Sequence, residues 1–351
     1  MNARWLWLAP FLAACSDEPT IGAPSTNSAE LRVPISDRGR VFVKLGAPAV
    51  ATMDGDPKTS GDWDLAFEGY DVFTNGGASG NGRGGAFGPL DAVTFLDDQA
   101  PAVPFVTADR AGGAFLEWYA YDGTSHALYT RFHVYGVRDG ARTWKVQIVG
   151  YYGERDGAAV AALYRVRWAE VRAGGVGPTQ EAVNVDGTAG GAKAPATEPS
   201  ACLDLDRGER TMLTPDVAAT SNAWHLCFRR AAISVNGGMG GTRGVSAVDL
   251  GAIEEPPEAV KDKTADGELA AFDAVNATTF ETRPFRGDRV VSAFGTKWIE
   301  PGTSPAAPTS AAWLVVGPDG ASRYLVGVSA FEGASTEAPG VAVLKIKRVR
   351  E

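Results

Sequence analysis

The stretch from Trp63 to Gly85 constrains the fold of this chain more than any other. It begins WDLAFEG, in which Trp63, Leu65 and Phe67 alternate with small or acidic residues. A hydrophobic period of two predicts a β-strand with one buried face. After Gly69 the alternation shifts by one residue, which indicates a bulge or bend at that glycine. The strand then ends in an Asn-Gly-Gly turn and a glycine-rich loop.

The same pattern occurs a second time. Residues 224–241 read WHLCFRRAAISVNGGMGG, and their Trp, Leu, Phe, Asn and Gly positions match those of the first stretch 161 residues earlier. A second pair of segments, DGARTWKVQIVGY at 139–151 and DGASRYLVGVSAF at 319–331, shares a turn and an aromatic-led alternation at an offset of 180 residues. Two matches in the same order indicate an internal duplication.

These repeats predict two domains in tandem. The chain has 351 residues, which suits two domains of about 150 residues each. We predict an all-β fold of two antiparallel β domains, residues 30–172 and 200–351, joined by a Gly/Pro/Ala-rich linker at 173–199. The 43 glycines favour turns and short strands, and residues 266–275 are the strongest helical candidate.

Charge and motif content exclude several classes of function. A net charge of −9 and a pI near 5.0 argue against nucleic-acid binding, since a phosphate backbone requires a basic surface. The chain has three histidines, and it contains no G-x-S-x-G elbow and no H-E-x-x-H motif. We therefore expect a protein that is not an enzyme.

The N-terminus predicts export. Residues 1–14 carry one basic residue, Arg4, and then the apolar run WLWLAPFLAA, which is too short for a permanent membrane anchor. This signal peptide ends in Leu-Ala-Ala-Cys15, which resembles the lipobox of bacterial lipoproteins, and the resemblance implies lipidation of Cys15. Residues 15–29 follow as a polar tether. In a diderm host the protein would lie on the outer membrane or cell surface; an ordinary cleaved signal peptide with a chance cysteine is the alternative.

Cys202 and Cys227 are the remaining cysteines. In an oxidising compartment outside the cytoplasm they can pair in a disulfide. Two small buried thiols are the alternative.

Two histidines lie in an aromatic-rich segment. His126 falls between two predicted strands of YAYDGTSHALYTRFHVYGV, and His133 belongs to the second of them. An imidazole among tyrosines could offer its nitrogen to an iron while the aromatic rings cover a flat porphyrin. Polar residues at a hairpin and on a wet sheet face are the alternative. The third histidine, His225, is expected to be a surface imidazole.

Two blocks of the sequence resemble the HmuY family of bacterial haem-binding lipoproteins. The first is WDLAFEGYDVFTNGG with the following GRGGAF, and the second is WYAYDGTSH with the later VYGVRDG and WKVQIVGYY. Together they cover most of residues 40–171. The resemblance implies an all-β fold, a place on the outer membrane or cell surface, and capture of haem for delivery to a TonB-dependent outer-membrane receptor. It carries over His126 as an iron ligand, with His133 as a second candidate and Met53 behind it.

The second copy departs from this pattern. At the 180-residue offset His126 falls on Ala306 and His133 falls on Trp313. Met239, in the glycine turn of the second copy, is a soft candidate ligand, although packing is the commoner role of such a methionine. We therefore expect the second HmuY-like domain to be degenerate. The alternative function is a non-haem surface interaction module built on the same duplicated β scaffold.

Overall fold

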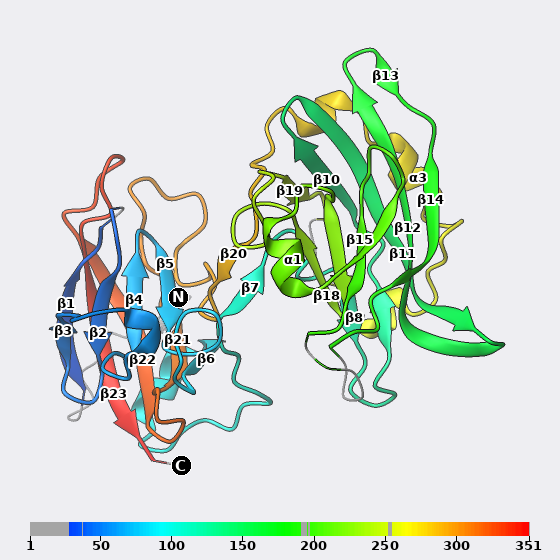
Figure 1. Ribbon diagram of the computed structural model, residues 1–351. Helices are drawn as coiled ribbons and strands as arrows, with labels where there is room; N and C mark the ends of the chain where they lie inside the picture. Colours follow the sequence, from blue (N-terminus) through cyan, green and yellow to red (C-terminus); the bar gives the residue numbers. More distant parts are fainter. Residues whose placement is uncertain (1–27, 37, 191–194, 196, 252–254, 351) are drawn as a thin grey trace, which may run out of the picture. The chain divides into compact units, whose positions relative to one another are not determined.

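The computed structural model describes residues 28–36, 38–190, 195, 197–251 and 255–350 (Figure 1). Strands in antiparallel sheets dominate these residues and the helices are short, which confirms the all-β prediction. The predicted signal peptide and Cys15 lie outside the described residues. Within the described part of the chain, no helix has both the length and the apolar character needed to cross a membrane.

The chain forms two compact units. Unit 1 consists of Met1–Asp109 and Ser292–Glu351, and unit 2 consists of Arg110–Val291. Unit 1 therefore joins the start of the first predicted domain to the end of the second. Unit 2 contains the remainder of both, so the predicted boundaries at 172 and 200 do not separate the units.

Unit 1 is built from two antiparallel sheets. One sheet has the order β1-β23-β22-β21-β6, and the other has the order β3-β2-β4-β5. Their strands are β1 (Ala29–Pro34), β2 (Val41–Lys44), β3 (Ala49–Ala51), β4 (Leu65–Glu68), β5 (Asp71–Thr74), β6 (Gly85–Leu90), β21 (Ala312–Val316), β22 (Arg323–Glu332) and β23 (Val341–Val349). Two 3-10 helices, η1 (Pro57–Thr59) and η2 (Ala92–Leu96), lie in the connections.

The core of unit 1 lies between these sheets. Leu65 and Phe67 of β4 belong to the same buried cluster as Val326 of β22 and Leu344 of β23. A second cluster forms where Phe95 of η2 packs against the other face of the large sheet. Unit 1 is therefore a β-sandwich with an added cover on one sheet.

Unit 2 has the same kind of architecture. Its sheets have the orders β13-β12-β11-β10-β19, with β14 beside β12, and β16-β15-β17-β18; β8 pairs with β9 and β7 with β20. The strands are β7 (Arg110–Gly112), β8 (Tyr119–Tyr121), β9 (Leu128–Thr130), β10 (Val134–Asp139), β11 (Arg142–Arg155), β12 (Ala158–Arg172), β13 (Gly175–Val176), β14 (Gln180–Asp186), β15 (Ser200–Leu203), β16 (Arg210–Leu213), β17 (Leu226–Arg229), β18 (Ala232–Val235), β19 (Ser246–Asp249) and β20 (Arg289–Val291). The helices are α1 (Pro215–Thr220), α2 (Pro257–Val260), α3 (Leu269–Ala274) and η3 (Ala277–Phe280).

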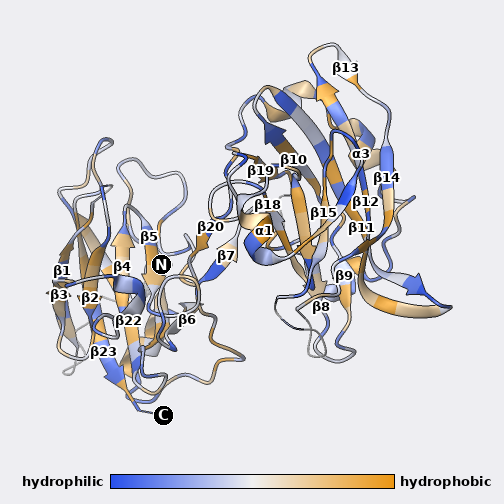
Figure 2. Cartoon of the chain, viewed as in Figure 1, coloured by the Kyte–Doolittle hydropathy of each residue, from blue (hydrophilic) through white to orange (hydrophobic). Residues whose placement is uncertain are grey.

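The long strands of unit 2 alternate in hydropathy, and both of their faces are covered. Apolar and polar residues alternate along β11 and β12 (Figure 2). The apolar face, with Trp144 and Val166, packs into the sandwich core. On the polar face Lys145 is only 2% exposed, and its Nζ donates to the carbonyl of Phe272, 2.8 Å away in α3. The helical candidate at 266–275 is thus present as α3, where it covers this face.

The two units correspond strand by strand. The order β1-β23-β22-β21-β6 in unit 1 matches β14-β12-β11-β10-β19 in unit 2. A buried asparagine also recurs: Asn75 Nδ2 donates to the carbonyls of Ser60 at 2.8 Å and Trp63 at 2.9 Å. Its counterpart Asn236 donates to Ser221 at 2.8 Å and Trp224 at 3.0 Å, 161 residues later in each case.

The predicted linker contains structure. β13 and β14 lie inside residues 173–199, and β14 pairs with β12 just as β1 pairs with β23. Ala182 and Val185 of β14 are buried in the core of unit 2. The segment is rich in small residues, which concealed the strand, and its pairing partner supplies the stability that its composition lacks.

Gly69 lies in a tight hairpin turn between two strands, whereas the sequence predicted a bulge or bend within one strand. β4 and β5 pair with each other, with Leu65 opposite Thr74 and Glu68 opposite Asp71. Gly69 has a φ of 54°, as the two-residue turns that join antiparallel strands require. The shift in alternation therefore marks a change of strand.

Candidate functional site

His126 lies at the tip of the β8–β9 hairpin. The turn before it is held by Asp122, whose carboxylate accepts hydrogen bonds from Thr124 N at 2.8 Å and Ser125 Oγ at 2.5 Å. His126 has a φ of 58° and is exposed. Its Nδ1 lies 2.6 Å from the hydroxyl of Tyr121, so one ring nitrogen is fixed by the hairpin itself.

This arrangement suits a metal ligand. A ligating histidine usually hydrogen-bonds through one ring nitrogen, which orients the ring for the other. Tyr121 engages Nδ1, and within the described part of the chain Nε2 of His126 forms no hydrogen bond or ion pair. His126 therefore offers one oriented nitrogen at the surface.

An aromatic pocket adjoins this hairpin. We use this name for the cavity of about 200 Å³ that is lined by Leu128, Tyr129, Thr130, Phe132, Gly150, Tyr151, Tyr152, Val260, Lys261 and Lys263. The hydroxyl of Tyr152 accepts a hydrogen bond from Leu128 N at 3.0 Å, which ties the end of β11 to the hairpin. Pockets that enclose a drug-sized ligand measure about 300–1,000 Å³, so this one would hold part of a larger flat molecule.

His133 lies elsewhere and is fully engaged. It directly precedes β10, its side chain is 7% exposed, and its Nδ1 lies 3.0 Å from Oδ2 of Asp249. Its Nε2 lies 3.0 Å from Oε2 of Glu255. Burial disfavours the charged ring, but the two carboxylates outweigh that effect and raise the pKa of His133. With both nitrogens occupied, His133 does not fit the predicted role of an iron ligand.

Neither methionine candidate is among the residues that line the aromatic pocket. Met53 lies in unit 1, whereas His126 lies in unit 2. Met239 is half exposed and lines a separate cavity of about 230 Å³ beside the cysteines. The described residues contain no group of three or more His, Cys, Asp or Glu side chains suited to a metal ion. Of the two histidines predicted to bind haem, His126 alone fits the group.

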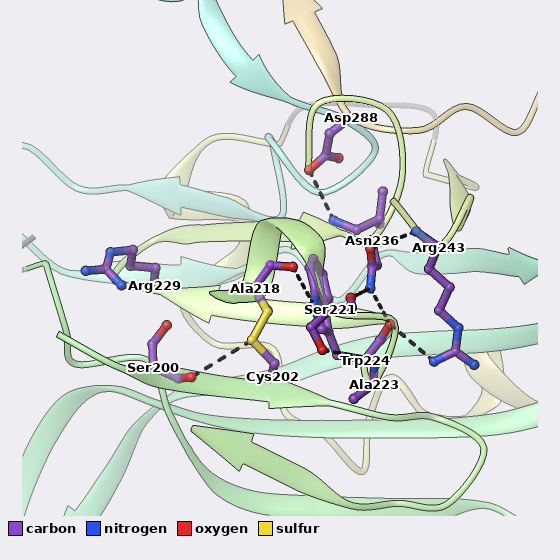
Figure 3. Close-up of a disulfide and its surroundings, with 12 residues drawn as sticks. Ser200, Cys202, Ala218, Ser221, Ala223, Trp224, Arg229, Asn236, Arg243 and Asp288 are labelled. Carbon is purple, nitrogen blue, oxygen red and sulfur yellow. Dashed lines mark hydrogen bonds between the residues drawn. A yellow bond between two sulfur atoms is a disulfide. The ribbon is translucent and has the colours of Figure 1, made fainter. Parts of the chain in front are cut away.

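Cys202 and Cys227 form a disulfide (Figure 3). They face each other on the paired strands β15 and β17, and Cys202 is 1% exposed. The bond closes a loop with a sequence separation of 25 residues inside unit 2.

His225 is buried, which corrects the prediction of a surface imidazole. Its side chain is 0% exposed, and its Nδ1 accepts a hydrogen bond from Leu205 N at 3.1 Å. Burial and the Arg243 cation lower the pKa of His225 to about 4. In unit 1 the corresponding Asp64 performs the same task, accepting from Leu45 N at 2.7 Å. His225 therefore has a structural role.

Sequence reasoning missed the partners of His133. Asp249 ends β19, and Glu255 lies in an insert of the second half that carries no motif. The one available signal was the acidic character of that insert, EEPPEAVKDK at 254–263. It gave no indication that Glu255 contacts His133, a residue in the first half of the sequence.

A comparison with protein families bears on this geometry. The model of the HmuY family, described as HmuY protein, matches residues 38–164. No curated protein matches the chain. The matched stretch includes the Trp63 strand, the β8–β9 hairpin and β11, and it continues across the division between the units at Asp109. Over residues 38–164 this chain is therefore similar to the HmuY family, a family of haem-binding proteins.

Proposed function

We propose that this chain is a lipid-anchored extracytoplasmic protein that captures haem at the β8–β9 hairpin and delivers it to an outer-membrane receptor. The observation that carries the proposal is His126, an exposed imidazole with Nδ1 held 2.6 Å from the Tyr121 hydroxyl, inside the HmuY-matched stretch. A neutral imidazole nitrogen is a common axial ligand of haem iron.

The surroundings of His126 suit a flat, largely apolar group. Tyr121 is 51% exposed and Tyr152 is 47% exposed, and Tyr129 lines the adjoining pocket. Aromatic faces at the surface provide apolar contact area together with hydroxyl groups that stay in water. Lys261 and Lys263 add positive charge to the pocket wall, which suits a ligand with carboxylate groups.

A haem titration of the soluble form lacking residues 1–15 tests the proposal. We expect a saturable shift of the Soret band that His126→Ala abolishes. Tyr121→Phe removes the hydroxyl that orients the ring, so it should weaken binding by about 10- to 100-fold. Met239→Ala, in the other candidate site, should leave the titration unchanged. No Soret shift with any oxidation state of haem would refute haem capture and favour the interaction-module function.

Lipid anchoring has a separate test. Cys15 follows a short apolar signal sequence, and acylation there would tether the folded units to a membrane. We expect Cys15→Ser to move the full-length protein from the membrane fraction to the soluble fraction and to abolish incorporation of a labelled fatty acid. Retention of the label by the variant would refute lipidation at Cys15.

We also propose that the second half of the chain arose by duplication of the first and has lost haem binding. The shared strand order and the recurring asparagine support this origin. In unit 1, the segment that follows Ser292 brings no histidine, because all three histidines precede residue 226. Haem binding with a stoichiometry of two per chain would contradict the loss.

A further inference from the structure

The two nitrogens of His133 each face a carboxylate. Nδ1 lies 3.0 Å from Asp249 Oδ2, and Nε2 lies 3.0 Å from Glu255 Oε2. A neutral imidazole has one N–H donor and one lone pair, so it satisfies one carboxylate and repels the other. Only the doubly protonated ring donates to both. The geometry is therefore that of an imidazolium held between two anions.

The site is shaped around this ring. Gly251 packs directly against it, and a Cβ at residue 251 would lie 2.2 Å from His133 Nδ1. Gly251 N also donates to Asp249 Oδ1 at 2.8 Å, which orients that carboxylate. Any larger residue at 251 would displace the imidazole.

Glu255 connects His133 to the aromatic pocket. It begins a stretch, residues 255–263, that we call the pocket segment; this stretch includes α2. Val260, Lys261 and Lys263 of the pocket segment line the aromatic pocket, and Val260 is 1% exposed. The contact between His133 and Glu255 thus fixes the start of the stretch that forms one wall of the pocket.

We infer that His133 is a positioning residue, whose imidazolium holds the pocket segment against the aromatic pocket and releases it when the ring loses its proton. The effect on a ligand rests on the proposed function of this pocket. The effect on the segment stands on the two carboxylate contacts alone.

Other charged groups limit the size of the effect. Arg131 Nε donates to the backbone carbonyl of Glu255 at 3.1 Å and lies 4.0 Å from its carboxylate. Lys263 Nζ lies 3.4 Å from Glu255 Oε1, while the ring of Tyr135 packs 6.3 Å from that of His133. Arg131 and Lys263 therefore contact Glu255 independently of His133. Deprotonation of His133 should therefore raise the opening equilibrium of the pocket segment by about tenfold, and the segment should stay attached.

The direction of the pH dependence follows from the raised pKa of His133. The interaction is fully present below the pKa of an unperturbed histidine, about 6.5, and is lost as pH rises through the higher value in the folded protein. The pocket segment should be well ordered at mildly acidic pH and looser in alkali.

Hydrogen exchange of the full soluble chain without haem tests the inference. At about pH 6 we expect amides of residues 258–263 to exchange about tenfold faster in His133→Gln than in the unmodified protein, and at about pH 9 we expect the two to agree. Glu255→Gln, which leaves His133 in place, should show the same loss of protection. Equal exchange in all three proteins at pH 6, or a His133 imidazole pKa below about 6.5 by NMR, would overturn the inference.

Haem titration separates this role from ligation. His133→Gln should keep the Soret position of the complex and lower haem affinity about tenfold at pH 6, whereas His126→Ala should abolish the shift and leave the exchange of the pocket segment unchanged. A Soret band displaced by His133→Gln would overturn the positioning role. If the unmodified protein binds no haem, the proposed function fails, and the exchange and NMR results still decide the role of His133.

Discussion

Asp288 provides a quantitative test of the fold of unit 2. Its Oδ2 accepts a hydrogen bond from Val235 N at 3.1 Å, and its Oδ1 is buried without a hydrogen-bond partner among the described residues. Burial raises the pKa of Asp288 to about 7, from an ordinary value of 3.8. The burial outweighs the hydrogen bonds from Val235 and Ser234, which by themselves lower the pKa, so the carboxyl group is held in its neutral form.

The sign and size of the pH effect follow from this shift. Between about pH 4 and pH 7 the folded protein keeps the proton on Asp288 and the unfolded chain does not, so the free energy of unfolding falls as pH rises. A shift of about three units corresponds to about 4 kcal/mol at 1.36 kcal/mol per unit. This stability is complete below pH 4 and lost above pH 7.

The variant Asp288→Asn isolates the effect, because an amide keeps an acceptor for Val235 N and carries no charge. In this variant residue 288 does not titrate, so it should contribute no change in the free energy of unfolding between pH 4 and pH 7. Above pH 7 its free energy of unfolding should exceed that of the unmodified protein by about 1–3 kcal/mol. The gain is smaller than about 4 kcal/mol because a buried amide nitrogen without a hydrogen-bond partner is itself destabilising. Exchange of the Val235 amide reports on unit 2 directly, and Asp156→Asn, at an exposed turn, is the matched control. Parallel pH profiles for the protein and Asp288→Asn would refute the reasoning.

Two further changes test the recurring features of the units. Asn75→Ala and Asn236→Ala each remove two hydrogen bonds to buried or partly buried carbonyls, so each should lower the free energy of unfolding of its own unit by about 2–4 kcal/mol in urea titrations; an effect in one unit only would contradict their equivalence. The double variant Cys202→Ala/Cys227→Ala should destabilise unit 2 by about 3.5 kcal/mol, the loop entropy for a separation of 25 residues, and added reductant should then have no effect. A loss below about 1 kcal/mol would contradict the entropic account.

The strands could be predicted from the sequence, whereas their partners could not. Alternation identified β2, β11, β12 and β23 because the period of two is a local property. Which strands pair depends on contacts between residues far apart in sequence, and nothing local distinguishes β1 with β23 from a pairing inside the first half. For this reason the predicted domains, 30–172 and 200–351, differ from the two compact units.

The candidate site was predictable to the same limited extent. The aromatic-rich YAYDGTSH sequence located His126 and its tyrosines, because a hairpin keeps its residues together. The partners of His133 lie 116 and 122 residues away, on β19 and in the insert. Those contacts give His133 a structural role instead of the predicted role as an iron ligand. Only the three-dimensional structure reveals them.

Each unit combines strands from the first and the second half of the sequence. This arrangement leads to a prediction about a fragment. Residues 30–172 contain β2–β12 and all of β1 except Ala29. With β1 in the place of β14, these strands make one complete set of the sheet strands of a unit. In the full chain β1–β6 belong to unit 1 and β7–β12 belong to unit 2, in which β7 pairs with β20. A fragment has no second half to supply β20, so two copies can reproduce the arrangement by exchanging halves, with β7 pairing to β7.

We therefore expect the fragment 30–172 to form a dimer at micromolar concentration, with mass measured by light scattering. A folded monomer would contradict this expectation. It would show that the chain after Asp109 can fold back, so that β7–β12 pack with β1–β6 of the same copy when the second half of the sequence is absent. The full chain should remain monomeric under the same conditions, because each of its halves already has a partner within the chain.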